Sequence, residues 1–379
     1  MKLASLLSSR FVSTFARVVA AAAIATVAAV AAPADASNPI GQGAVRSLVP
    51  SSPGFPEGIV VDQDRYFVSG PATFGTAGQG PSTVNVFSKK TGALQKTIAI
   101  QGEATQYEHA LSCITADDQG RLYALSTQLG VVRLTEDHKG RWTQQIYAPS
   151  FPMLPSCYDV EPGETCSPKL VSALPPIPND LAFDDDGNLY VTDSFQATIF
   201  RIPAGGGEAQ IWFQSPALVS PPGMIGLNGL RIGPHGNEIY FTVTATLASG
   251  GGEGVIYKLP LVDQPAEEDL ELVHSYPAGE GPDGIAFGQH GKLYVALAMS
   301  NQVSVLNRHG AEINRLSGPG GSAIPFDAPA NVAFDHKGSL LVVNHALFTR
   351  NPSHMAVLQV FVGDNGETGN GGGCDGDDD

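Results

Sequence analysis

The sequence predicts an all-β fold, a six-bladed β-propeller with four-stranded blades. Three observations predict it: a strand–turn–strand pattern recurs six times, further short strand-like runs follow each copy, and the 379 residues include 44 Gly and 28 Pro. The best-defined copy is Pro178 to Ser194, PNDLAFDDDGNLYVTDS, in which two apolar runs flank a polar turn. Repeats of this size that are rich in strand and turn signals are typical of propeller blades.

The six copies begin at equivalent residues that lie 47 to 67 residues apart: Glu57, Ser112, Asn179, Asn228, Asp283 and Ala330. So many copies in the same register make unrelated hairpins in a β-sandwich the poorer interpretation. Each of the first five copies is followed by two further strand-like runs, whereas the sixth is followed only by Ala356 to Val362. We expect Ala44 to Val49 to supply the missing strand and to close the ring, which removes an exposed edge.

The propeller is predicted to occupy residues 37–362. Residues 1–36 are predicted to be a signal peptide, because a basic start precedes the apolar run Val18 to Ala32 and a small-x-small cleavage site ends at Ala36. A retained membrane anchor is the weaker alternative, because this run is shorter than the roughly 20 residues that a membrane span needs. The Gly- and Asp-rich residues 363–379 are predicted to be disordered.

The charge of the chain excludes some classes of partner. Without the signal peptide it has 18 Lys and Arg against 36 Asp and Glu, a net charge of −18. Such a chain repels nucleic acid and anionic lipid, so we expect neither as a partner. We predict a secreted or periplasmic monomer that acts on a small-molecule substrate and has no membrane contact once the signal peptide is removed.

The four cysteines fit an exported chain, in which disulfides persist. Cys157 and Cys166 flank a short polar loop and are predicted to form a bridge. Cys113 and Cys374 either form a second bridge or remain free thiols, and no cysteine–histidine spacing indicates zinc.

The start positions of the six copies carry the candidate chemistry. The first strand of each blade is innermost, so these positions converge on the central channel at one end. Four of them bear side-chain oxygens: Glu57, Asn179, Asn228 and Asp283. Two carboxylates and two amide oxygens suit Ca²⁺, or another hard divalent cation, better than zinc or copper. The alternative is that these residues cap turns through hydrogen bonds to the backbone.

The motifs PEGIVVD, PNDLAF, GLNGL and GPDGIAF resemble those of the gluconolactonase and regucalcin family of six-bladed propellers, related to paraoxonase and diisopropyl-fluorophosphatase. The resemblance extends over nearly all of the chain after the signal peptide. It implies that Glu57, Asn179, Asn228 and Asp283 bind a catalytic calcium or other divalent ion, and that Asp283 is the general base or nucleophile.

This chain departs from the family around the second blade. Ser112 stands where paraoxonases place a catalytic histidine, and YEHALS, residues 107–112, lacks the Arg-x-Asn pattern of gluconolactonase-like members. Among the nine histidines, His109 and His345 are the two that we expect at the end of the channel where the candidate metal ligands converge. Both are candidates for proton transfer, with a structural role as the alternative.

We therefore predict an exported calcium-dependent hydrolase of a lactone or related ester, with the metal at the centre of the propeller. One alternative is a phosphotriester hydrolase that uses the same four metal ligands. The other is a non-catalytic ligand- or partner-binding propeller with a structural calcium. The insertion Ala148 to Pro178 is expected either to be a solvated loop or to be a lid over the channel. The lid would offer substrate four apolar side chains: Phe151, Met153, Leu154 and Tyr158.

Overall fold

The structure, a computed structural model, describes residues 43–49, 54–248, 250–318, 324–335 and 337–367. All of them belong to one compact unit, Pro33–Asp379. The predicted signal peptide, residues 1–36, lies outside the described residues. Within the described ranges, no helix is long and apolar enough to cross a membrane.

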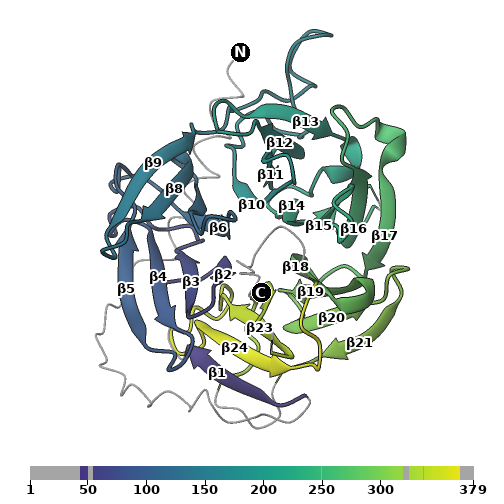
Figure 1. Ribbon diagram of the computed structural model, residues 1–379. Coiled ribbons are helices and arrows are strands. Elements are labelled where there is room, and N and C mark those ends of the chain that lie inside the picture. Colours follow the sequence, from purple (N-terminus) through teal and green to yellow (C-terminus); the bar gives the residue numbers. More distant parts are fainter. Residues whose placement is uncertain (1–42, 50–53, 249, 319–323, 336, 368–379) are drawn as a thin grey trace. The chain divides into compact units, whose positions relative to one another are not determined.

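Six four-stranded antiparallel sheets confirm the predicted propeller (Figure 1). Blade one contains β2 (Ile59–Val61), β3 (Arg65–Gly70), β4 (Thr83–Ser88) and β5 (Leu94–Ala99). Blade two contains β6 (Leu111–Ala116), β7 (Leu122–Ser126), β8 (Gly130–Glu136) and β9 (Trp142–Ala148). Blade three contains β10 (Pro178–Phe183), β11 (Leu189–Asp193), β12 (Thr198–Ile202) and β13 (Gln210–Gln214).

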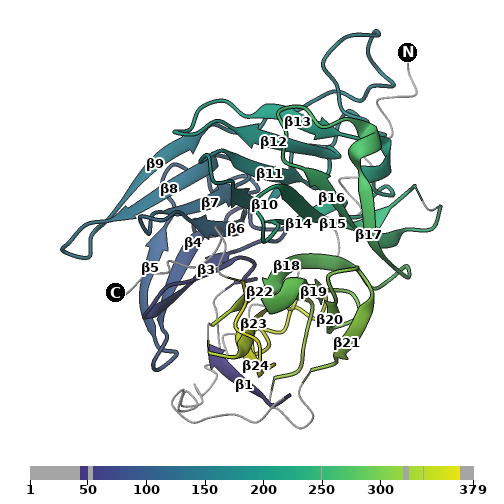
Figure 2. The same cartoon turned by 45° about the vertical axis from the view of Figure 1, so that its right-hand side comes forward.

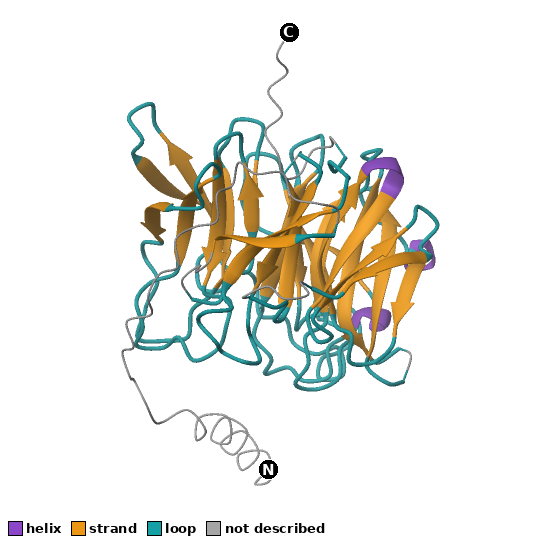
Figure 3. Ribbon diagram, turned by 90° about the horizontal axis from the view of Figure 1, so that it is seen from below, coloured by secondary structure: helices purple, strands orange, loops and turns teal. Residues whose placement is uncertain are grey.

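The second half of the chain continues the pattern. Blade four contains β14 (Leu227–Ile232), β15 (Glu238–Thr246), β16 (Glu253–Pro260) and β17 (Glu271–Tyr276). Blade five contains β18 (Pro282–Gly288), β19 (Lys292–Leu297), β20 (Gln302–Leu306) and β21 (Glu312–Leu316). Blade six contains β22 (Pro329–Phe334), β23 (Ser339–Asn344), β24 (Ala356–Phe361) and β1 (Val45–Val49). The helices of the described residues are short 3₁₀ turns, shown in Figure 3: Pro216–Leu218, Glu267–Asp269 and Gln289–Gly291.

The blades form a closed ring around their first strands. Each first strand contacts the first strands of both neighbouring blades, in the order β2, β6, β10, β14, β18, β22 and back to β2 (Figures 1 and 2). The predicted closure is also confirmed, because β1 pairs antiparallel with β24, with Val45 opposite Val360 and Ser47 opposite Leu358. The N-terminal segment thus completes the last blade and covers its edge.

The inner hairpins explain why the sequence repeat is so regular. In blade two, the Oδ1 of Asp117 accepts hydrogen bonds from the backbone N–H groups of Gln119 (3.0 Å) and Arg121 (2.9 Å). A side-chain acceptor of this kind satisfies the donors of a tight turn between two strands. Blades one, three and six have an aspartate at the equivalent position, and its Oδ1 also accepts a hydrogen bond from a backbone N–H group; these residues are Asp62, Asp184 and Asp335.

The insertion before β10 is folded onto the outside of blade three, which does not support the predicted lid. Phe151 and Leu154 are buried in the apolar core between blades two and three, so they cannot contact substrate as expected, whereas Met153 and Tyr158 are exposed. The side chain of Gln196 holds the insertion through the backbone of Pro152 and Leu154. In Figure 1 the insertion extends past β13, away from the centre of the ring.

The cysteines and the C-terminal segment complete the fold. The predicted Cys157–Cys166 disulfide is present, and Cys113 is a buried free thiol, while Cys374 lies outside the described residues. The first residues of the predicted disordered tail are folded: the buried carboxylate of Asp364 accepts hydrogen bonds from the Gln289 backbone and the Tyr294 hydroxyl. The rest of that tail, from residue 368 on, lies outside the described residues.

Candidate functional site

A β-bulge recurs where five of the six inner strands begin. In blade three, Pro178 lies opposite Asp193 and Leu181 lies opposite Val191, so β10 has one residue more than β11 over this stretch. Blades two, four, five and six have a register shift at the equivalent place. A bulge redirects side chains and breaks their alternation between two faces. As a result Asn179 and Asp180, although consecutive, both make polar contacts with neighbouring inner elements.

The two predicted amide ligands are held in one orientation. The Nδ2 of Asn179 donates to Ser194 Oγ at 3.1 Å, and the Nδ2 of Asn228 donates to Thr244 Oγ1 at 2.9 Å. Each hydroxyl in turn donates its own hydrogen to a backbone carbonyl of the following blade, at 2.6 and 2.9 Å. Because the hydroxyls have no second hydrogen, they can only accept from the amides. The amide oxygens therefore point away from them, and the Oδ1 of Asn228 is buried without a hydrogen-bond partner.

Glu57 and His345 meet at the junction of blades one and six. The Nδ1 of His345 lies 3.1 Å from Glu57 Oε2, and both side chains are buried. Burial lowers the pKa of His345 to about 4, with the Ala72 backbone acting in the opposite direction, so the ring is neutral at pH 7 and this contact is not an ion pair. The contact is also not aligned as a hydrogen bond, because Glu57 Oε2 has no hydrogen-bond partner of regular geometry.

The two predicted carboxylate ligands influence one another. Burial and then the charge of Asp180 raise the pKa of Glu57 to about 8. Burial also raises the pKa of Asp283 well above its usual range, and the charges of Glu57 and Asp180 add to that effect. These carboxyl groups are therefore close together and short of positive charge. A divalent cation would favour the ionised form of both.

The residues present fit a calcium ion in their chemistry. Among the described residues, nine buried side-chain atoms lack a hydrogen-bond partner, and three of them belong to Glu57, Asn228 and His345. Buried oxygens without partners are rare and call for a ligand or ion. No three His, Cys, Asp or Glu side chains cluster as a metal centre in the described part of the chain. The predicted set differs from such clusters because two of its four donors are amides.

The sequence matches the SMP-30/gluconolactonase/LRE-like region over residues 83–344, more than half of the chain. The chain belongs to this family. Three solved structures are similar to this member of the family. The calcium-binding protein regucalcin from Agrobacterium tumefaciens is 16% identical with a TM-score of 0.56, over 86% of this chain and 96% of that one. A luciferin-regenerating enzyme is 14% identical with a TM-score of 0.56, over 85% and 96%.

The third structure is a gluconolactonase from Xanthomonas campestris, 16% identical with a TM-score of 0.50, over 83% of this chain and 88% of that one. At these identities the structures support the SMP-30/gluconolactonase fold and no finer property. No curated protein sequence matches the chain significantly.

His109 does not offer a free nitrogen in this member of the family. Its Nδ1 lies 2.9 Å from the carbonyl oxygen of Tyr107, and its Nε2 lies 2.8 Å from that of Gly80. Although burial opposes the effect, these two carbonyls raise the pKa of His109, since both nitrogens must carry hydrogen to donate to them. The ring joins the β3–β4 loop to the start of blade two. We therefore leave His109 out of the candidate catalytic set.

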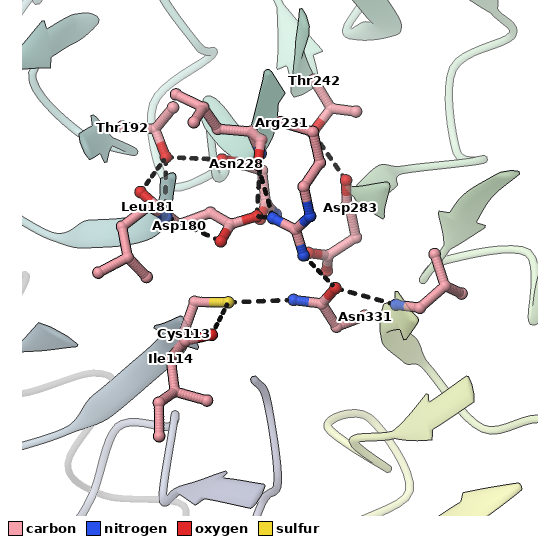
Figure 4. Close-up of polar contacts among 12 residues, drawn as sticks. Cys113, Ile114, Asp180, Leu181, Thr192, Asn228, Arg231, Thr242, Asp283 and Asn331 are labelled. Carbon is pink, nitrogen blue, oxygen red and sulfur yellow. Dashed lines mark hydrogen bonds and ion pairs between the residues drawn. The ribbon is translucent and has the colours of Figure 1, made fainter. Parts of the chain in front are cut away.

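A second polar group lies beside the predicted ligands, and we missed it at the level of the sequence (Figure 4). It consists of Cys113, Asp180, Arg231 and Asn331, from four different blades. A signal for three of them was available: Cys113, Asp180 and Asn331 each directly follow a start position of the repeat. The equivalent residues of the other blades are Gly58, Gly229 and Gly284.

All three glycines leave room for their neighbours, and a Cβ atom at Gly58 would lie 2.5 Å from the backbone nitrogen of Ile114. A Cβ atom at Gly229 would lie 2.4 Å from the carbonyl oxygen of Asp283, and one at Gly284 would lie 2.6 Å from the side chain of Asn331. Such distances are shorter than real contacts. The glycines thus allow the inner strands to approach closely where the candidate ligands begin.

Proposed function

We propose that this protein is a calcium-dependent, lactonase-like hydrolase whose site lies where the six inner strands begin. Glu57, Asn179, Asn228 and Asp283 would hold the ion. The observation that supports this most directly is the fixed orientation of the two amides, which turns their oxygens away from Ser194 and Thr244. Membership in the SMP-30/gluconolactonase/LRE-like family supports the substrate class, a lactone or related ester.

The ion would supply Lewis-acid polarisation of the scissile carbonyl, which stabilises the negative charge that develops on its oxygen. Asp283 is the candidate base or nucleophile. Its carboxylate would remove a proton from the attacking water, or attack the carbonyl carbon directly. The Asp283 backbone is fixed because its carbonyl oxygen accepts a hydrogen bond of 2.8 Å from Thr242 Oγ1 of blade four.

His345 is the candidate for relaying to the departing alcohol the proton that Asp283 would take from water. The ring is neutral at pH 7, and its Nε2 has no regular hydrogen bond, so one nitrogen remains open to a proton. The ring of Phe55 packs edge-on against it, with centroids 5.9 Å apart. This packing fixes the ring plane and keeps water from that side of the imidazole.

The deciding experiment combines a panel of lactones with a metal titration. Purified protein should hydrolyse at least one lactone, lose that activity in chelator and regain it with added calcium. Calorimetry should detect binding of calcium to one site, and replacing both Asn179 and Asn228 by Ala should abolish it. Calcium binding without turnover of any lactone or aryl ester would instead favour a ligand-binding propeller with a structural ion. Turnover of phosphotriesters alone would favour the phosphotriesterase alternative.

We further propose that the protein is exported. The leader pattern in residues 1–36 supports this, and so does the Cys157–Cys166 disulfide, since disulfides persist in oxidising compartments. Expression of the full-length chain should give a mature protein in an extracytoplasmic fraction that begins at Ser37. A protein that keeps residues 1–36 and remains in the cytoplasm would contradict this proposal.

A further inference from the structure

We propose that the Arg231–Asp180 ion pair adjusts the charge of the central channel to that of one divalent cation, which makes Arg231 a selectivity residue for the metal. This inference rests on the proposed function. It concerns residues beside the four candidate ligands, and it predicts which cation the site prefers and how that preference can be changed.

Asp180 is a fully engaged, buried carboxylate. Its side chain is 1% exposed, and its Oδ2 accepts hydrogen bonds from Arg231 Nη1 (2.7 Å) and the Leu230 backbone (2.9 Å). Its Oδ1 accepts a hydrogen bond from the Leu181 backbone at 2.8 Å. Asp180 also lies close enough for its charge to act on Glu57 and Asp283. Asp180 therefore contributes a negative charge to the same buried region as the candidate ligands.

Arg231 is held as a fixed positive charge in that region. Besides the ion pair, its Nη1 donates to its neighbour's carbonyl, Leu230 O, at 2.6 Å. Its Nη2 donates to Asn331 Oδ1 at 3.2 Å, and Asn331 Nδ2 in turn lies 3.2 Å from Cys113 Sγ. Figure 4 shows the guanidinium between these partners from blades three and six. Such a guanidinium stays protonated across the pH range in which the protein is folded, and its hydrogen bonds hold it in place.

The formal charges of the side chains in this region do not sum to zero. The buried carboxylates of this cluster are Glu57, Asp180 and Asp283, and its cation is Arg231, whose side chain is 15% exposed. With all three carboxylates ionised, as a bound cation favours, three negative charges and one positive charge leave −2, which one divalent cation neutralises. Net charge in a buried site is costly, so a site prefers the cation that completes its neutralisation. Removing Arg231 would leave −3 and favour a trivalent ion, whereas neutralising Asp180 would leave −1.

A purely structural role for the pair makes a different prediction. The pair joins β10 to β14, so it could serve only to hold blades three and four together. In that case a variant lacking either charge would lose stability. Its calcium affinity would not vary with the net charge of the cluster. A variant lacking both charges would show the same cation preference as either single variant. A charge series therefore separates the two roles.

The test compares the wild type with Arg231→Met, Asp180→Asn and the double variant that combines them. Calcium and terbium(III) are each titrated by calorimetry in metal-free buffer. We expect Asp180→Asn to weaken calcium binding about 10- to 100-fold, because a unit charge near a buried ion acts through an effective dielectric of roughly 20. We expect Arg231→Met to shift the preference toward terbium by at least about 10-fold. The double variant restores −2 and should return to the wild-type preference within about 3-fold.

The matched control is Asp364→Asn. Asp364 is equally buried and lies 3.2 Å from Lys292, but it belongs to the segment that packs on blade five, outside the cluster. Its loss should leave both cation affinities unchanged. If one single variant fails to fold, the other single variant decides, because a purely structural pair would leave its cation preference unchanged. If the wild type binds calcium and all variants show the same cation preference, this inference is overturned and the proposed function stands. If the wild type does not bind calcium, the proposed function is overturned as well.

Discussion

Thr244 provides the sharpest test of how the amide ligands are oriented. Its Oγ1 accepts from Asn228 Nδ2 at 2.9 Å and donates to Pro282 O at 2.9 Å. Thr244→Val keeps the shape of the side chain and removes both hydrogen bonds. The Asn228 side chain also contacts the Asp283 carboxylate, and without Thr244 Oγ1 its amide is free to rotate while it keeps that contact. The calcium-binding state needs the amide oxygen turned toward the ion, so the variant must give up this rotational freedom when it binds calcium.

The magnitude follows from the hydrogen bond that is lost. A buried hydrogen bond contributes about 0.5–1.5 kcal/mol, and leaving a partner unsatisfied costs about 1–3 kcal/mol. The amide rotation relieves part of that cost in the calcium-free state only. We therefore expect calcium affinity to fall about 5- to 30-fold, which corresponds to about 1–2 kcal/mol. Calorimetric titration of calcium measures this directly.

Thr242→Val is the matched control on the same strand. Thr242 Oγ1 donates to the Asp283 carbonyl at 2.8 Å and makes no hydrogen bond to a candidate amide ligand. Both variants should unfold at lower temperature, because both lose a hydrogen bond between blades four and five. Only Thr244→Val should also weaken calcium binding. Unchanged affinity in Thr244→Val, or an equal loss in Thr242→Val, would refute the reasoning about amide orientation.

Three further outcomes are expected. Asp283→Asn should fold and retain an oxygen donor but lose roughly 10²-fold or more in kcat, the scale of general-base loss, and wild-type turnover would return the role to His345. Without calcium, the melting temperature should fall as the pH rises from about 4.5 to about 8 and then level off, because the pKa of Glu57 is raised from 4.5 to about 8 in the folded state. Calcium should oppose this fall, and Glu57→Gln should remove only part of it, because the pKa of Asp283 is raised by burial as well. Phe151→Ala should cost about 3–5 kcal/mol of stability without changing KM, whereas the exposed neighbour Met153→Ala should change stability by less than about 0.5 kcal/mol.

Much of the fold could be predicted from local patterns. The hairpin repeat, the six blades, the closing strand at Val45–Val49 and the Cys157–Cys166 bridge all follow from alternating apolar residues, turn residues and spacing. These features depend on short-range backbone preferences and on a period that each blade repeats. Four candidate ligands could be chosen for the same reason, since equivalent positions of a propeller converge.

The insertion shows where local pattern was a poor guide. Its length and its apolar side chains suggested a lid. Phe151 and Leu154 instead found a core to join between blades two and three, and Gln196 bound the backbone between them. Whether an apolar side chain faces substrate or core depends on the surface available beside it, and that surface is built by residues far away in the sequence.

The polar group beside the ligands depended entirely on the tertiary structure. Asp180, Arg231 and Asn331 come from blades three, four and six, and nothing in their own segments indicates that they meet. A strand pattern predicts that consecutive side chains alternate between faces, but the bulge at Asn179 and Asp180 breaks that rule. Closure of the ring then brings the redirected side chains within hydrogen-bonding distance. Charge balance in a channel is a property of all the blades together, so it arises only when the ring is closed.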